Sequence, residues 1–203
     1  MAVNECLRAI SMDVSMDCSN PITSGIERRA VIVNRADIDF ANVTFNTSRP
    51  NVVEALPLKT GKRGYSVRVD GDTPFTGTAV NMEKKTYRNV FTNTFSFTVL
   101  GNDPDLSRSV IDALTNGDFV VVFENKYKNI NKESNKGDST YQIMGLRQGL
   151  NAETIACDKY SEDTDGGWAI TLTESNVAES ALFLYKTDLS TTEALFNSLT
   201  DVA

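Results

Sequence analysis

The chain has 203 residues, a formal net charge of −7 and no histidine. This length suits one domain with a substantial core, and 23% charged with 40% hydrophobic residues is typical of a globular protein. The negative charge argues against a protein that binds nucleic acid by neutralising phosphates. The lack of histidine excludes Ser-His-Asp and Cys-His catalysis and most zinc sites.

The first predicted strand covers residues 10–19, "ISMDVSMDCS", where apolar and polar residues alternate without interruption. Successive side chains of a strand point to opposite faces. We therefore expect the apolar side to face a core. The opposite side carries only serines and the two acids Asp13 and Asp17.

Further strands are predicted after a turn at residues 19–25. They cover residues 28–34, 37–45, 51–58, 65–70 and 89–101, with turns at 59–64 and 71–77. In the longest, Phe91, Phe95, Phe97 and Val99 share one face and hydroxyl residues share the other. This alternation predicts a strand with one buried face.

A helix is predicted over residues 102–117, where the period changes from two to that of a helix. Asp103 is the expected N-cap, Pro104 the first helical residue and Gly117 the stop. Four apolar residues form the expected buried stripe: Leu106, Val110, Ile111 and Leu114.

The rest of the chain again reads as strands. Residues 118–125 are apolar on both faces, which predicts a central covered strand, and further strands are expected at 140–145, 153–158, 166–175 and 181–187. A C-terminal helical tail at 189–203 is predicted to be capped by Ser190, with Glu193 completing a capping box. The sequence thus predicts one mainly-β domain over residues 1–203, a sandwich or barrel with one inserted helix.

Two short segments resemble ligand-binding loops only in part. Residues 161–167, "SEDTDGG", hold Glu162, Asp163 and Asp165, but an EF-hand alignment would put Ser161 and Leu172 at ligand positions. Residues 60–63 lack the upstream glycine of a phosphate loop. We interpret both as turns, and the sequence predicts no catalytic residue, metal site or cofactor.

The three cysteines and the N-terminal residues favour folding in a reducing cytoplasm. Cys6, Cys18 and Cys157 are scattered and odd in number, so we expect free buried thiols. The first ten residues contain Glu5 and no apolar run, so we expect no signal peptide.

The segment 126–139 is long for a hairpin loop and is expected to protrude. It is rich in lysine (Lys126, Lys128, Lys132 and Lys136) in a chain that is otherwise acidic. One interpretation is a solvated loop with incidental charge. The other is an arm that docks on an acidic face of another subunit, because one basic protrusion on an acidic protein favours head-to-tail contacts between copies.

Two stretches resemble virion proteins of phages and prophages of Bacteroidetes bacteria: "DVSMDCSNPITSGIERRAVIVNRADID" (13–39) and "YQIMGLRQGLNAETIACDKYSEDTDGGWAITLTE" (141–174). The shared features are an early "DC…GI" turn, a strand ending "N..DI", a "GL..GL" passage before an acidic loop, and a "G…I.L" strand. The likeness spans about residues 10 to 187 and is to the tail-tube-like family, which includes tail hubs and connectors of crAss-like phages.

This resemblance implies a β-sandwich or barrel with a side helix and a long hairpin. It also implies homo-oligomeric rings, commonly six-fold, that form a DNA conduit in the virion tail after synthesis in the bacterial cytoplasm. The expected partners are copies of the chain, adjacent ring or hub proteins, and genomic DNA that passes without specific binding. A conduit wall should be neutral or negative, so Asp13 and Asp17 are candidate lumen-facing acids.

A different class of function stays open at this point: a carbohydrate- or receptor-binding β-sandwich of a head-decoration or tail-fibre protein. Such a module needs an exposed aromatic platform. The single tryptophan, Trp168, lies in phase with Ile170 and Leu172, which indicates a core position.

Overall fold

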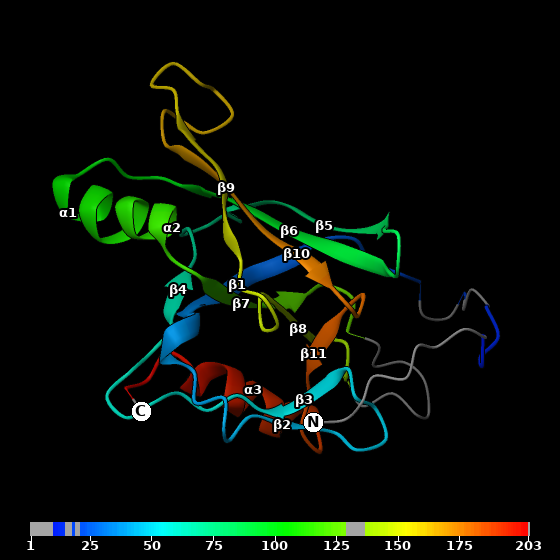
Figure 1. Ribbon diagram of the computed structural model, residues 1–203. Helices are drawn as coiled ribbons and strands as arrows, with labels where there is room; N and C mark the ends of the chain where they lie inside the picture. Colours follow the sequence, from blue (N-terminus) through cyan, green and yellow to red (C-terminus); the bar gives the residue numbers. More distant parts are fainter. Residues whose placement is uncertain (1–9, 15–17, 19–20, 129–136, 203) are drawn as a thin grey trace.

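The computed structural model describes residues 10–14, 18, 21–128 and 137–202 (Figure 1). This part of the chain is mainly β and forms two sheets without a closed barrel, so the predicted fold class is confirmed at that level and the barrel alternative is wrong. All strand pairs are antiparallel except β3 with β11.

The larger sheet has seven strands. Their spatial order is β2 (Thr44–Phe45), β3 (Val52–Ala55), β11 (Leu182–Leu184), β8 (Tyr141–Met144), β7 (Phe119–Asn125), β1 (Ile26–Asn34) and β4 (Tyr65–Val67). The smaller sheet is ordered β5 (Phe75–Lys84), β6 (Asn89–Val99), β10 (Trp168–Val177) and β9 (Asn151–Cys157). The two sheets pack through one apolar cluster that contains residues of both.

Strand β7 lies inside the seven-stranded sheet, as its apolar run predicts. Phe119, Val121 and Phe123 belong to the cluster shared with the four-stranded sheet. Val120 and Val122 belong to a second cluster on the opposite face. Burial on both faces explains why the strand has no polar alternation.

Helix α3 (Leu189–Ser198) covers that second face, where Phe196 packs in the same cluster as Val31. The C-terminal helix is confirmed, but the predicted cap is wrong. Asp188, two residues before Ser190, is the N-cap, and its carboxylate accepts a hydrogen bond from the Thr191 N–H at 2.7 Å. A 3-10 turn, η1 (Arg35–Asp37), follows β1.

The inserted helix consists of α1 (Pro104–Leu106), a π-helical turn η2 (Ser107–Ile111) and α2 (Asp112–Asn116). The predicted cap is confirmed, because Asp103 accepts from the Leu106 N–H at 2.9 Å, and Gly117 ends the helix as expected. Ile111 is buried, but Val110 is 37% exposed, so the predicted stripe is wrong at that residue. The wider π turn changes the angular spacing on which the stripe was based.

Three strand predictions differ from the structure. The predicted strand 37–45 shrinks to the two residues of β2. Strand β5 was not predicted, and its first residues fall in the predicted turn 71–77; eight of its ten residues are exposed, so it has no alternating burial to detect. The predicted strand 10–19 is wrong over residues 10–14, which form no strand.

Candidate functional site

The four-stranded sheet presents an outer face of small, mostly uncharged side chains. On β6 and β10, core residues such as Phe95 and Leu172 alternate with residues that point away from the core. Together with their registered neighbours on the edge strands, these are Thr92, Thr94, Ser96, Thr171, Thr173, Gly77, Ala79, Asn81, Thr154 and Ala156. Two acids hydrogen-bond to hydroxyls of this face, Glu83 with Thr92 and Glu153 with Thr173, and Glu83 also pairs with Lys85.

Both edges of this sheet are open. Within the described part of the chain, β5 pairs only with β6 and β9 pairs only with β10. Each outer edge therefore leaves backbone N–H and C=O groups without a ladder partner. Because the three successive pairs are antiparallel, β5 and β9 run in opposite directions.

One end of the sheet carries positive charge. The β5–β6 turn, residues 85–88, is closed by a hydrogen bond from the Lys85 N–H to the Arg88 carbonyl at 3.1 Å. An open hollow of about 430 Å³ beside it is lined by Lys84, Lys85, Tyr87, Arg88, Val90 and Asn176. The Lys85 ammonium lies 2.7 Å from Glu83, whose carboxyl pKa is lowered mainly by this hydrogen bond.

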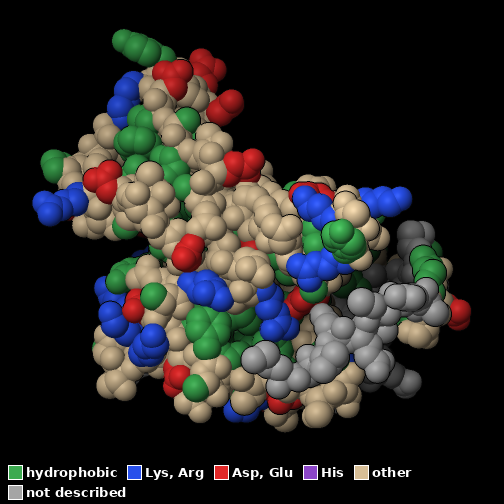
Figure 2. Space-filling model, in the orientation of Figure 1, with side chains coloured by type: hydrophobic (Ala, Val, Ile, Leu, Met, Phe, Trp, Pro, Cys, Tyr) green, Lys and Arg blue, Asp and Glu red, His purple; other side chains and the backbone are tan. Residues whose placement is uncertain are grey.

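The opposite end carries negative charge on the β9–β10 loop, residues 158–167, at the top of Figures 1 and 2. Asp158, Glu162, Asp163 and Asp165 are all exposed. Backbone hydrogen bonds hold the loop, among them Gly166 N–H to the Ser161 carbonyl at 3.1 Å. The prediction of a hairpin turn is confirmed, and within the described residues no cluster of ligating side chains could hold a metal ion.

A buried carboxylate joins the two sheets. Glu174 on β10 is 2% exposed. Its Oε2 accepts from Asn93 Nδ2 at 3.1 Å and from the Gly145 N–H at 2.8 Å, and its Oε1 accepts from the N–H groups of Arg147 and Gln148 at 3.1 and 2.8 Å. Sequence reasoning missed this residue, although it lies in phase with the core residues Ile170 and Leu172.

The turn that meets Glu174 requires glycine at its first position. Gly145 has a φ angle of +89°, a backbone conformation that residues other than glycine rarely adopt. A Cβ there would also clash with the Phe119 carbonyl oxygen. The local conformation at Gly145 therefore directs the backbone N–H groups after β8 toward the carboxylate of Glu174 in the other sheet.

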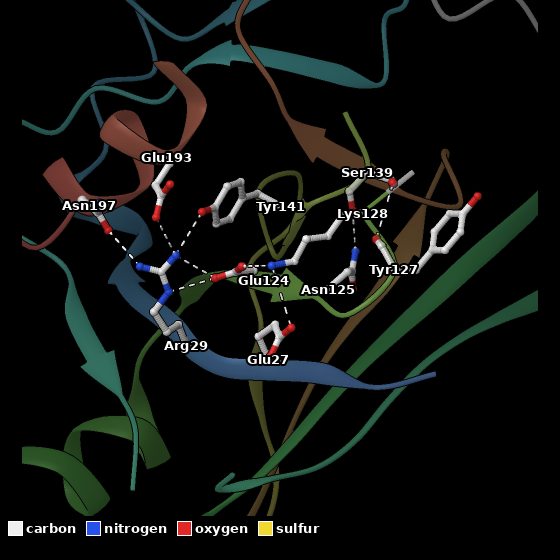
Figure 3. A network of polar contacts seen from close by, with 10 residues as sticks. All are labelled: Glu27, Arg29, Glu124, Asn125, Tyr127, Lys128, Ser139, Tyr141, Glu193 and Asn197. Carbon is white, nitrogen blue, oxygen red and sulfur yellow. Dashed lines mark hydrogen bonds and ion pairs between the residues drawn. The ribbon is translucent and has the colours of Figure 1, made fainter. Parts of the chain in front are cut away.

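A polar network joins α3 to the seven-stranded sheet (Figure 3). Arg29 of β1 donates to the Glu124 carboxylate at 2.8 Å, to the Tyr141 hydroxyl at 3.1 Å and to Glu193 of α3 at 3.2 Å. Its guanidinium also lies 5.3 Å from the ring centroid of Phe196. These contacts fix the helix against the sheet.

The charged groups of this network find their partners within the chain. Burial raises the pKa of Tyr141 to about 12, and the nearby Glu124 carboxylate adds to the effect. Burial lowers the pKa of Arg29, but the interactions with Glu124, Tyr141 and Glu193 together outweigh it, so the net shift is upward. The Tyr141 phenol is thus neutral at physiological pH, and we interpret the network as structural.

The lysines predicted for an inter-subunit arm have different surroundings. Lys128 lies 2.6 Å from Glu124 and 3.8 Å from Glu27, so it is paired within its own chain (Figure 3). Lys126 is exposed. Lys132 and Lys136 lie outside the described residues. The hairpin itself is confirmed, because β7 and β8 pair in antiparallel register on either side of this loop.

The described residues 10–14 have no core against which their apolar side could pack. Ile10, Met12 and Val14 are 81–93% exposed, so the apolar side of residues 10–14 meets no core. Asp13 is also exposed, and Asp17 lies outside the described residues. Cys18 is exposed and Cys157 half-buried, so the expectation of buried thiols is wrong for Cys18, although both are free; Cys6 is not among the described residues.

Comparisons with protein-family models, with curated proteins and with solved structures find no match to this chain. No helix in the described part is long and apolar enough to cross a membrane.

Proposed function

We propose that this protein is a ring-forming structural subunit of a phage virion, a β-sandwich of the tail-tube-like kind that lines or supports the DNA conduit of a tail tube, hub or connector. One observation carries the proposal: a four-stranded sheet with two open edges and an outer face of small, mostly uncharged side chains. The sequence resemblance leads to the same class of protein.

The strand directions suit closure into a ring. If β5 of one copy lies beside β9 of the next, the two strands run antiparallel, and the alternation inside the sheet continues across the contact. A rotation that repeats this contact generates a closed wall without free edges. Six copies, the symmetry implied by the resemblance, would each add four strands to that wall.

The outer face suits the inside of such a wall. DNA is attracted by lysine and arginine through release of its counterions. The hydroxyls of Thr92, Thr94 and Ser96 offer no such charge, and Glu153 adds repulsion, whereas the charge of Glu83 is offset by Lys85. A genome would therefore slide along this face without being held.

The alternative, a glycan-binding module, receives less support. Aromatic side chains bind sugars when they form one platform, but Tyr87 (99% exposed) and Tyr160 (94% exposed) lie at opposite ends of the four-stranded sheet. Trp168 packs against the core between the sheets.

The first experiment removes a backbone donor from the open edge of β5. Neighbouring residues of an edge strand alternate between N–H groups that face the partner strand and N–H groups that face outward. We therefore compare two single variants, Ala79→Pro and Val80→Pro. One variant loses a backbone hydrogen bond to β6 and should therefore be destabilised. The other loses only an N–H group that faces outward; it should keep the native melting temperature but fail to form rings.

Native mass spectrometry and negative-stain microscopy at high protein concentration give the readout. The native chain is expected to form rings, and the stable proline variant is expected to remain monomeric. A native chain that stays monomeric at concentrations comparable to virion packing contradicts the proposal, as do rings of native size from the stable proline variant.

A second experiment tests the conduit. Thr94→Lys places a cation at the centre of the outer face, between Ala79 of β5 and Thr173 of β10. Rings of this variant should retain duplex DNA at low salt and release it at high salt, whereas native rings should not retain it. Equal retention by the two proteins would refute a lumenal position of this face.

A further inference from the structure

The two ends of the four-stranded sheet carry opposite charge. The basic end consists of Lys84, Lys85 and Arg88 around the β5–β6 turn, with Glu83 as its counter-charge. The acidic end consists of Asp158, Glu162, Asp163 and Asp165, with Lys159 as the opposing charge. Within the described part of the chain, Lys84 and Arg88 have no ion pair, and neither do the four acids.

These two ends cannot meet within one chain. The register pairs Lys84 with Asn89 at one end of the sheet and Trp168 with Val99 at the other. Strand β6, which runs between them, has 11 residues, and a strand rises by about 3.3 Å per residue, so the ends lie roughly 30 Å or more apart. Charges at such a distance are screened at physiological salt. Any pairing between them is intermolecular.

The two ends also differ in form. The basic end borders an open hollow of about 430 Å³, to which Tyr87 contributes an aromatic wall. The acidic end is a loop held by internal hydrogen bonds, including Ser161 N–H to the Asp158 carbonyl at 3.1 Å and Gly167 N–H to the Thr164 carbonyl at 2.8 Å. A loop with its own backbone bonds loses less conformational entropy on docking.

We propose that the β9–β10 loop of one copy docks in the hollow at the β5–β6 turn of a second copy, and that this contact joins successive rings. It rests on the proposed function for the rings themselves. The sheet edges join copies across the strand direction, whereas the sheet ends join copies along it. A contact of this head-to-tail kind repeats without closing, and it therefore builds a stack.

Three charge variants test the contact. Lys84→Glu with Arg88→Glu reverses the basic end, and Glu162→Lys with Asp163→Lys reverses the acidic end; all four positions are exposed, so the fold should be retained. Each double variant should form single rings that do not stack. The quadruple variant carries both reversals, keeps the net charge of −7, and should stack like the native chain. A 1:1 mixture of the two double variants should also stack, because each end then meets a complementary one.

A matched control reverses two acids elsewhere. Asp70→Lys with Asp201→Lys changes the net charge as much as the acidic-end variant does, at exposed residues that lie in neither the β5–β6 turn nor the β9–β10 loop. It should stack like the native chain, and stacking of native rings should weaken as salt rises. Particle lengths in negative stain and sedimentation velocity measure all five proteins.

The outcomes separate this proposal from the proposed function. Native rings that do not stack, double variants that stack normally, or a quadruple variant that does not recover would overturn the docking contact and leave the ring intact. A native chain without rings would overturn both. Duplex DNA could also be retarded by the native chain in a gel-shift assay but not by the variant Lys84→Glu with Arg88→Glu. That result would show that the basic end binds DNA phosphates, and it would overturn the contact.

Discussion

Replacement of Glu174 by glutamine tests the buried carboxylate that joins the two sheets. The native side chain accepts four hydrogen bonds at 2.8–3.1 Å, two on each oxygen. Glutamine keeps one oxygen, and its amide nitrogen cannot accept. At the Oε2 position the nitrogen could donate to Asn93 after a flip of that amide, since Asn93 Oδ1 has no partner, but the Gly145 N–H would then lack an acceptor.

The cost follows from these contacts. One buried unsatisfied donor costs about 1–3 kcal/mol, and each remaining bond weakens by about 1 kcal/mol when its acceptor loses its charge. The lower desolvation cost of a neutral side chain offsets part of this. We expect the free energy of unfolding to fall by about 2–4 kcal/mol, which corresponds to a drop in melting temperature of about 5–12 °C for a domain of this size.

Urea unfolding followed by fluorescence measures this loss, because the single tryptophan, Trp168, lies on the same strand as Glu174. Glu153→Gln is the matched control: it makes the same chemical change at an exposed residue of the same sheet and should cost less than about 0.5 kcal/mol. Equal midpoints for the two variants would refute the assignment of Glu174 as the link between the sheets.

Three further predictions concern the other face of the seven-stranded sheet. Tyr141 has a pKa of about 12 in the folded chain against 10.0 ordinarily. The folded chain thus keeps a proton that the unfolded chain loses, and the free energy of unfolding should fall by about 2 kcal/mol as pH rises from 10 to 12. Tyr141→Phe should flatten that slope, measured by urea unfolding at each pH; an unchanged slope would assign it to other groups. Asp188→Ala should cost about 1 kcal/mol through loss of the α3 cap, whereas Ser190→Ala should cost less than about 0.5 kcal/mol; thermal melts that reverse this order would restore Ser190 as the cap. Arg29→Met should destabilise the fold by about 1–3 kcal/mol in urea unfolding, because Glu124 keeps only Lys128 as a charged partner; a stability like that of the native chain would show that the pair with Lys128 suffices.

The sequence predicts those elements whose residues differ in burial from one position to the next or are buried throughout. Strand β6 shows the period of two, β7 shows a continuous apolar run, and the helix ends at 103 and 117 carry their own capping residues. Strand β5 is not recognisable in the sequence because it is exposed on both faces. The alternation in residues 10–14 gives a wrong prediction, because a period of two defines the two faces of a strand but does not supply a neighbouring strand to pair with.

Most of the candidate site depends on contacts between residues far apart in the chain. Arg29 meets residues 95 to 168 positions away, and no local pattern specifies such pairs. The two charged ends of the smaller sheet are visible as charges in the sequence, but their placement at opposite ends requires the strand order. Glu174 is the exception, because its phase on β10 marks an acid on a core face.

The parallel pair β3–β11 has a consequence for how the chain acquires its shape. Val52 is in register with Phe183, so the larger sheet joins an early part of the polypeptide to a very late one. Loop closure over so many residues must precede the favourable contacts, and such topologies fold slowly. During synthesis on the ribosome, the strands that emerge first must wait for β11. Folding of the sheet is therefore expected to be delayed until β11 has left the ribosome, and the interval before it is one in which a chaperone would be useful.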